Sequence, residues 1–515
     1  MNWDSQTYRL SRVGYWLQEH RISMDFANDA RLRFMPVNAE LFMLWLVSFF
    51  PIGYPLANLA QYLGGCLVLL AVFELGRLSC LSREARLAAA LLAAGTPVVV
   101  LEMATSQSDL FTAGLLCAGL VFGWRSLRSG SERETLYSGA ALGLAFGAKS
   151  SLAYWVPGIA LWFAFLCWRH RVTPKQVLRW TALTAGVAAL VGGWKYADNW
   201  VRFGNPFAPP AQIARIHDQG GAGLAERVSA VAASHLWQLA QPDSNPRFLG
   251  RFLGGVALPL GDRIEARVRD PRLRASFRSV RDAYRGDLVL EDVVSFGLLL
   301  PVMACMGIAF DLYRRVRRAD PGPPLRLAMS AAVAIFLGVF FMEMNLNPWN
   351  YRYFVTWVPF VAVAAAAALP FGRSPRFGMI CLLLIALFQG FTVVDLDERN
   401  CIGGVHSLFG RPQGTDVFET LARQVSGLDA SVVDVGVALP ENSWLSPYFR
   451  VEGVHRVQFF SVESLGENPR RFMEDHRLGA LVAMPDAFSR SQWASVDGRA
   501  SGLSGPFAAI VATRR

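Results

Sequence analysis

Four ionisable side chains are candidates for chemistry: Asp109, Lys149 and Arg352, which lie at the ends of apolar runs, and Asp4, which lies near the N-terminus. A charged group is costly in hydrocarbon, so an ionisable residue within or at the edge of a membrane usually serves a function. A carboxylate in such a place can accept a proton, and a Lys or Arg can stabilise an anion. Because the four residues are predicted at one depth, we expect a hydrated cavity at the outer surface of the membrane.

Each of these residues also has an interpretation without chemistry. Asp109 precedes a helix that is predicted to begin near Leu110, where Asp is a favoured N-cap residue. Asp4 lies in a polar tail, where a solvated charge is common. Lys149 and Arg352 could be anchors whose long side chains reach the polar headgroups. The four residues therefore support a functional site only as a group.

The composition places the elements around these residues in a membrane. Of 515 residues, 53% are hydrophobic and only 17% are charged, against about 25% charged residues in an ordinary soluble domain. A membrane-spanning helix needs roughly 20 apolar residues. We predict ten such spans, near residues 55–78, 84–103, 110–128, 135–149, 152–168, 178–197, 292–312, 326–343, 351–370 and 376–395.

The net charge of +10 is distributed in a way that predicts topology rather than nucleic-acid binding. The basic residues form no single patch of the kind that nucleic acids require. They form five groups between apolar runs, at 77–86, 125–133, 169–179, 314–318 and 373–376. Positive charge concentrates in cytoplasmic loops, so residues 1–50, residues 198–291 and everything after residue 396 are predicted on the outer side.

The sequence predicts two domains, a membrane domain at 1–395 and an α/β domain at 396–515 outside the membrane. In the second domain, amphipathic stretches at 418–425 and 468–475 alternate with apolar runs at 431–437 and 479–484, which is typical of βα units. The seven cysteines show neither a disulfide framework nor zinc spacing. Arg greatly outnumbers Lys and Ala is abundant, as in GC-rich bacterial genomes, so we expect a bacterial inner-membrane protein.

Several stretches resemble a known family. They are Asp4–Trp16 with Gln18, then Met35, Pro36, Ala39 and Glu40, then Thr105–Asp109, then Lys149, and finally Asn199 with Gly204–Phe207. Together they resemble the integral-membrane glycosyltransferases with the C-type fold, the superfamily of protein O-mannosyltransferases and aminoarabinose transferases, especially its bacterial branch. The resemblance covers residues 1–370.

Three departures from the family pattern stand out. Asp198 occupies a position where the family usually has Arg, and Ser5 follows Asp4 where the family often has a second acid. The family also has a membrane helix before the first Asp, so we expect a further apolar helix upstream of Met1.

The resemblance implies transfer of a sugar from a polyprenyl-phosphate donor to a lipid, glycan or protein acceptor on the outer face, with inversion at the anomeric carbon. Asp4 would then be the general base for the acceptor hydroxyl. Lys149 and Arg352 would stabilise the leaving phosphate. Asp109 would either orient the acceptor or share a divalent metal ion with Asp4.

The resemblance also implies that Tyr8, Arg12 and Glu40 help to bind substrate. Apart from the metal ion, which stays open, no cofactor is expected.

Two other classes of function stay open. A transporter or flippase of a lipid-linked or anionic substrate would also place charges within the membrane, although no repeated halves are visible in the sequence. A receptor or assembly factor would instead use the outer α/β domain. Whether Asp4, Asp109, Lys149 and Arg352 line one cavity discriminates between these classes and the transferase.

Overall fold

The computed structural model describes residues 5–23, 30–49, 54–217, 223–239, 247–283, 299–317, 325–343 and 348–369, and in the C-terminal region 431–438, 455–460, 468–483, 497–500 and 510–513, with a few isolated positions between them. The chain packs into two compact units. The first comprises Met1–Met35, Glu40–Leu59 and Val405–Arg515, and the second comprises Pro36–Ala39 and Ala60–Gly404. The predicted division at residues 395 and 396 stays a prediction.

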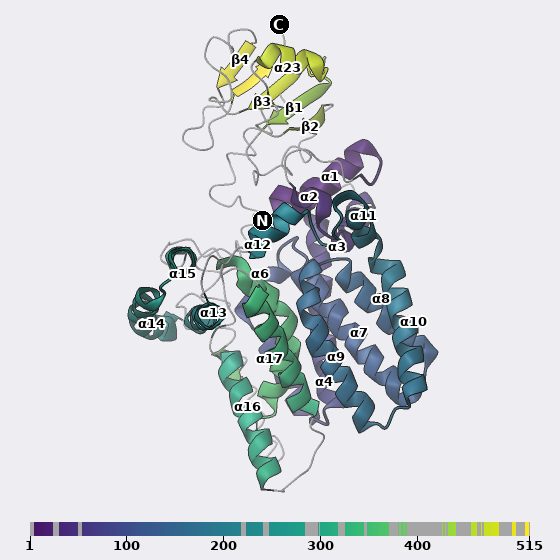
Figure 1. Ribbon diagram of the computed structural model, residues 1–515, viewed down its shortest axis with the longest axis vertical. Coiled ribbons are helices and arrows are strands. Elements are labelled where there is room, and N and C mark those ends of the chain that lie inside the picture. The colour runs from purple at the N-terminus through teal and green to yellow at the C-terminus, as the bar shows by residue number, and fades with distance from the viewer. Residues whose placement is uncertain are drawn as a thin grey trace. The chain divides into compact units, whose positions relative to one another are not determined.

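The second unit is helical. Its elements are α4 (Leu59–Leu78), α5 (Arg83–Ala94), α6 (Pro97–Met103), α7 (Asp109–Ser129), α8 (Glu132–Phe146), η3 (Ser150–Trp155), α9 (Val156–Arg169), α10 (Pro174–Gly192), α11 (Trp194–Phe203), α12 (Pro210–His217), α13 (Leu224–Leu239), α14 (Arg247–Arg267), α15 (Pro271–Ala283), α16 (Leu299–Val316), α17 (Leu325–Glu343), η5 (Pro348–Trp357) and α18 (Val358–Ala366). Helices α7, α8 and α10 lie side by side in Figure 1.

Within the described residues, four helices are long and apolar enough to cross a membrane, at Leu56–Leu78, Asp109–Ser129, Ser150–Arg169 and Leu325–Glu343. Two further predicted spans, 84–103 and 178–197, are bent pairs: α5 with α6 at 67° and α10 with α11 at 66°. Counting each pair as one span gives six. The last predicted span, 376–395, lies almost wholly outside the described residues, so the total of ten stays a prediction.

Local sequence permits both bends. Helix α5 ends at Gly95, and Pro97 begins α6 at a position where a proline needs no backbone N–H. Gly193 separates α10 from α11. Each break converts one predicted straight span into two helices.

Small residues let the helices of the second unit approach closely. A Cβ atom at Gly64 would lie 2.4 Å from the backbone nitrogen of Phe111, so α4 and α7 touch backbone to backbone. Gly114 makes the reciprocal contact with the carbonyl of Gly64. Such small-residue interfaces are the usual way in which helices pack in membranes.

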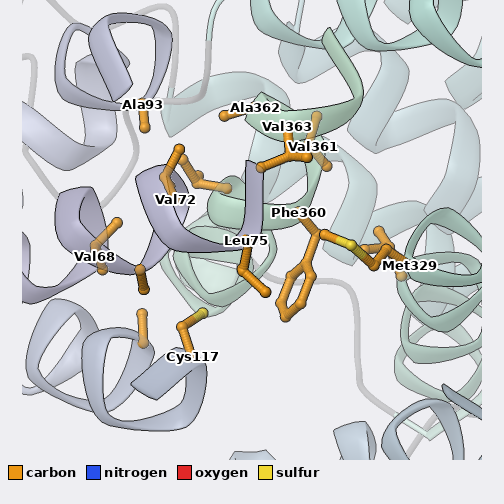
Figure 2. Close-up of a cluster of buried hydrophobic side chains, with 14 of the residues drawn as sticks. Val68, Val72, Leu75, Ala93, Cys117, Met329, Phe360, Val361, Ala362 and Val363 are labelled. Atoms are coloured by element: carbon orange, nitrogen blue, oxygen red, sulfur yellow. The ribbon is translucent and has the colours of Figure 1, made fainter. Parts of the chain in front are cut away.

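Apolar side chains from four helices form a core between them. Figure 2 shows Val72 and Leu75 of α4, Cys117 of α7 and Phe360 of α18 converging with Met329 of α17. All of these side chains are buried. The core therefore ties α4 and α7 to helices that follow them by more than 200 residues in the sequence.

The first unit combines helices from the N-terminal region with a sheet from the C-terminal region. The helices are η1 (Ser5–Arg9), α1 (Leu10–Glu19), α2 (Arg31–Phe34), α3 (Asn38–Ser48), η2 (Tyr54–Asn58) and α23 (Pro469–Asp475). The strands are β1 (Asp434–Ala438), β2 (Arg456–Phe459), β3 (Ala480–Ala483), β4 (Asp497–Ala500) and β5 (Ile510–Thr513), in the order β2-β1-β3-β5-β4. Strand β1 is parallel to β2 and β3, whereas β5 is antiparallel to β3 and β4.

Three predicted elements of the α/β domain are confirmed: the run 431–437 overlaps β1, the run 479–484 contains β3, and the stretch 468–475 contains α23. Asn468 caps α23 by accepting a hydrogen bond from the backbone of Arg471. The stretch 418–425 lies almost wholly outside the described residues. The predicted fold class, a mainly helical multi-pass membrane protein with a small α/β domain near its C-terminus, is therefore confirmed.

The end of helix α1 forms hydrogen bonds with the edge strand β2, a contact that the sequence did not predict. Gln18 accepts a hydrogen bond from the backbone nitrogen of Val457 at 2.8 Å and donates to its carbonyl at 2.9 Å, as a neighbouring strand would. Glu19 accepts two hydrogen bonds from Arg456, at 3.0 and 2.9 Å. These bonds raise the pKa of the Arg456 guanidinium. The end of α1 thus covers the exposed edge of β2.

Candidate functional site

Asp109 and Lys149 form a buried ion pair in the second unit. Asp109 is the first residue of α7, and Lys149 lies between the end of α8 and the start of η3. The Lys149 ammonium donates to Oδ1 of Asp109, whose side chain is 2% exposed. The turn after α8 positions the lysine, because the backbone nitrogen of Lys149 donates to the carbonyl of Ala145 at 3.1 Å.

Asp109 does not cap its own helix. Ser108 occupies the N-cap position, and no side chain caps α7 there. The Oδ2 atom of Asp109 is buried and accepts no hydrogen bond from the residues that the structure describes. The carboxylate therefore contacts the lysine rather than the first turn of its own helix.

The ring of Tyr353 lies close to both predicted cations, Lys149 and Arg352. The Lys149 ammonium lies 4.3 Å from the centroid of the Tyr353 ring, and the guanidinium carbon of Arg352 lies 5.6 Å from the same centroid. Both distances are within the range of cation–π attraction. Arg352 is 8% exposed and donates to Oε1 of Gln107 at 3.2 Å.

The structure thus brings together three of the four residues singled out for chemistry, Asp109, Lys149 and Arg352. Two cations lie at the ring of Tyr353 and only one carboxylate pairs with them, so the site has an excess of positive charge, which favours an anionic ligand. Asp4, the fourth residue, lies outside the described residues. Sequence reasoning missed Tyr353, although its place directly after Arg352 in an aromatic run was a signal.

A buried polar network holds the segment that carries Asp109. Gln61 of α4 donates to Oε2 of Glu102 at 2.7 Å and accepts from the backbone nitrogen of Phe111 at 2.9 Å. Thr105 accepts from the backbone nitrogen of Gln107 at 3.3 Å. These bonds fix both ends of the connection between α6 and α7, so Gln61 and Gln107 position the site. Neither was predicted from the sequence.

The substrate-binding residues predicted near the N-terminus lie in the first unit. Glu40 is fully buried and accepts a hydrogen bond from Arg9 at 2.8 Å, with Arg12 at 3.4 Å from the same oxygen. Arg12 also donates to the carbonyls of Arg31 and Leu32, at 3.0 and 2.9 Å. Buried charges of this kind are stable only when they are paired, so Glu40 and the two arginines hold η1 and α1 against α2 and α3.

Tyr8 belongs to the same cluster. The guanidinium carbon of Arg31 lies 4.4 Å from the centroid of the Tyr8 ring, and that of Arg9 lies 5.1 Å from it. Tyr8 is 2% exposed. The structure therefore brings Tyr8, Arg12 and Glu40 together, and their binding of substrate stays a prediction.

The described residues contain no cluster of three or more His, Cys, Asp or Glu side chains that could hold a metal ion. One oxygen of Asp109 already accepts a hydrogen bond from the ammonium of Lys149, so Asp109 by itself is a poor metal ligand. The predicted metal ion shared by Asp4 and Asp109 stays a prediction, because Asp4 lies outside the described residues.

The Asn-Pro-Phe element at 205–207 has a structural role. Asn199 of α11 donates to the carbonyls of Pro206 and Phe207, at 3.0 and 3.4 Å. Gly204 ends the helix with φ +68°, a conformation that favours glycine. Asp198, which departs from the family pattern, accepts from Lys195 at 2.6 Å and from Arg202 at 2.7 Å.

Known proteins resemble the chain at two levels. Residues 54–194, which include Asp109 and Lys149, match the family described as dolichyl-phosphate-mannose-protein mannosyltransferase. The fold matches the crystal structure of ArnT from Cupriavidus metallidurans bound to undecaprenyl phosphate, with a TM-score of 0.55 at 15% identity over 99% of this chain and 95% of that one.

The apo structure of the same ArnT matches with a TM-score of 0.55 at 15% identity, over 98% of this chain and 94% of that one. No curated protein sequence matches the chain significantly. The predicted resemblance is confirmed at the level of fold: the chain has the architecture of the C-type integral-membrane glycosyltransferases, the superfamily of ArnT and the protein mannosyltransferases.

Proposed function

We propose that the protein transfers a sugar from a polyprenyl-phosphate donor to an acceptor hydroxyl at the outer face of a bacterial inner membrane. The observation that carries this proposal is the pair of cations, Lys149 and Arg352, on the ring of Tyr353. A lipid phosphate supplies the anion for which this site is suited. The fold it shares with an ArnT that binds undecaprenyl phosphate supports the same class of donor.

In the proposed reaction, the acceptor oxygen attacks the anomeric carbon from the side opposite the phosphate, which inverts the configuration. The bond between the anomeric carbon and the phosphate oxygen breaks, and its electron pair stays on the phosphate. Lys149 and Arg352 stabilise the charge that develops there. Asp4 accepts the proton of the acceptor hydroxyl.

Asp109 has two functions in this proposal. It holds Lys149 on the ring of Tyr353 through the ion pair, and its second oxygen orients the acceptor. Tyr8, Arg12 and Glu40 also bind substrate in this proposal. Residues 396–515 lie on the outer side of the membrane, where the acceptor is found.

The test is transfer of a radiolabelled sugar from synthetic polyprenyl-phosphate donors by the purified protein in lipid nanodiscs. Lys149→Met and Arg352→Met should each reduce kcat by about 10²- to 10³-fold, the loss typical when one group that stabilises developing charge is removed. Lys175→Met is the matched control, because Lys175 is an exposed lysine in the first turn of α10. Wild-type rates in both site variants, as in the control, would exclude this site from the reaction.

A further inference from the structure

Helix α14 presents a stripe of apolar side chains to its surroundings. Phe252 is 71% exposed, Val256 59% and Leu260 47%. The three residues are spaced by four, so they lie along one face of the helix. An exposed apolar face on an ordered helix marks an interaction surface.

The last turns of α14 are packed against neighbouring helices. Ile264 joins a small core formed by Val231 of α13 and by Leu273 and Phe277 of α15. Glu265 accepts a hydrogen bond from Arg278 at 2.9 Å, which joins α14 to α15. The exposed stripe therefore precedes the packed turns of a helix whose position is fixed by its neighbours.

These three helices are attached to one end of a membrane span. Arg227 of α13 donates to the carbonyl of Met342 at 3.0 Å, and Phe341 packs against the small core. Both residues lie in the last turn of α17, which ends at Glu343. With 19 residues at about 1.5 Å each, α17 is as long as the hydrocarbon layer is thick, so its end lies at the interface between membrane and water.

The direction of α14 suits that interface. Figure 1 shows α13 and α14 nearly end-on at the left, whereas α16 and α17 run lengthwise in the same view. Helix α14 thus runs across the direction of the spans, in the plane of the membrane. This is the orientation of an amphipathic helix that rests on a bilayer.

The charges indicate which surface the stripe meets. Arg263 and Arg267 are exposed and follow Leu260 by three and seven residues, which places them on the same face as the stripe. Residues 247–283 contain nine Arg against four Asp or Glu, a net charge of +5. An apolar stripe that continues into arginines matches the acyl chains and phosphates of an anionic leaflet.

We propose that α14 lies in the headgroup region of the bilayer, with Phe252, Val256 and Leu260 at the level of the first acyl carbons and with Arg263 and Arg267 on lipid phosphates. The partner is an anionic lipid surface. The proposal does not depend on sugar transfer, and its test measures no activity.

The test places a nitroxide spin label at Val256→Cys in a cysteine-free protein and measures its exposure in nanodiscs of phosphatidylcholine with phosphatidylglycerol. The label should collide with oxygen and be shielded from a water-soluble nickel complex. A label at Asp262→Cys is the matched control. Asp262 is exposed on the same helix but lies about a third of a turn away from the stripe, so its label should be open to nickel.

Two results would overturn the proposal. Equal access of nickel to the labels at positions 256 and 262 would place the stripe in water. Dipolar broadening between labels at position 256, in discs that hold two copies, would assign the stripe to a second copy of the chain.

The arginines have their own test. The double substitution Arg263→Gln with Arg267→Gln should shift the label at position 256 toward water in anionic discs. In discs of pure phosphatidylcholine it should leave the depth of that label unchanged. An unchanged depth in both kinds of disc would remove the arginines from the proposal. Elution of each variant as a single species of wild-type size shows that the protein has folded.

Discussion

The carboxylate of Asp109 and the ammonium of Lys149 come from positions 40 residues apart and form an ion pair, and the ammonium also lies 4.3 Å from the centroid of the Tyr353 ring. Asp109 is the first residue of helix α7, and Lys149 lies in the turn after α8. The two helices pack along their whole length. The geometry of a helical hairpin thus sets the distance between the two charged groups.

We expect this ion pair to contribute to stability as well as to function. Asp109→Asn leaves a largely buried lysine without its counter-ion, and Lys149→Met does the same to the carboxylate, so each should lower the midpoint of thermal unfolding. The double variant should be more stable than the sum of the two losses predicts, with a coupling of roughly 0.5–3 kcal/mol. Additive losses, measured by nanoDSF in detergent, would show that the two groups act independently.

Asp4 should be needed for catalysis but not for folding. Asp4→Asn keeps the size and polarity of the side chain and removes its ability to accept a proton, so the rate should fall by about 10²- to 10⁴-fold. Sugar transfer and the elution profile are measured on the same preparation. A folded Asp4→Asn protein that transfers sugar at the wild-type rate would assign the base to another residue.

The effect of Asp109→Asn on the rate distinguishes its two proposed roles. If Asp109 orients the acceptor and holds Lys149, the substitution should reduce kcat less than Asp4→Asn does, and EDTA should have no effect. If the two acids share a divalent metal ion, both substitutions should reduce kcat to a similar extent and EDTA should reproduce the loss. Addition of Mg²⁺ or Mn²⁺ after EDTA then serves as the control for recovery.

The contact between α4 and α7 should tolerate no side chain at Gly64. An alanine Cβ would lie 2.4 Å from the backbone nitrogen of Phe111, so Gly64→Ala should separate the helices and sharply reduce the yield of folded protein. Gly186→Ala is the matched control, because a Cβ at this position in α10 meets nothing within 4 Å. Equal yields of the two variants in detergent would contradict the observed packing.

The C-terminus should lie outside the membrane. The basic groups at 77–86, 125–133, 169–179, 314–318 and 373–376 predict the cytoplasmic loops, and the last predicted span leads outward from them. Alkaline phosphatase, which folds only outside the cytoplasm, should be active when fused after Arg515. Activity of a β-galactosidase fusion at the same position would reverse the topology.

The sequence by itself determined the class of fold and the charged residues worth testing. Long apolar runs are a local property, so they predict membrane helices directly, and the runs that overlap β1 and β3 show their strand character within a few residues. Asp109 and Lys149 were visible for the same reason, because a charge at the end of an apolar run needs no other part of the chain to be noticed. The family pattern added Tyr8, Arg12 and Glu40.

Only the tertiary structure determined how those residues are grouped. Tyr353 joins Lys149 to Arg352 across more than 200 residues, and Gln18 pairs with Val457 across 439. Neither contact can be read from local periodicity, because each depends on how elements distant in the sequence pack together. The bends at 67° and 66° belong to the same category: Gly and Pro permit them, but the packing of the bundle decides whether an apolar run crosses straight or turns.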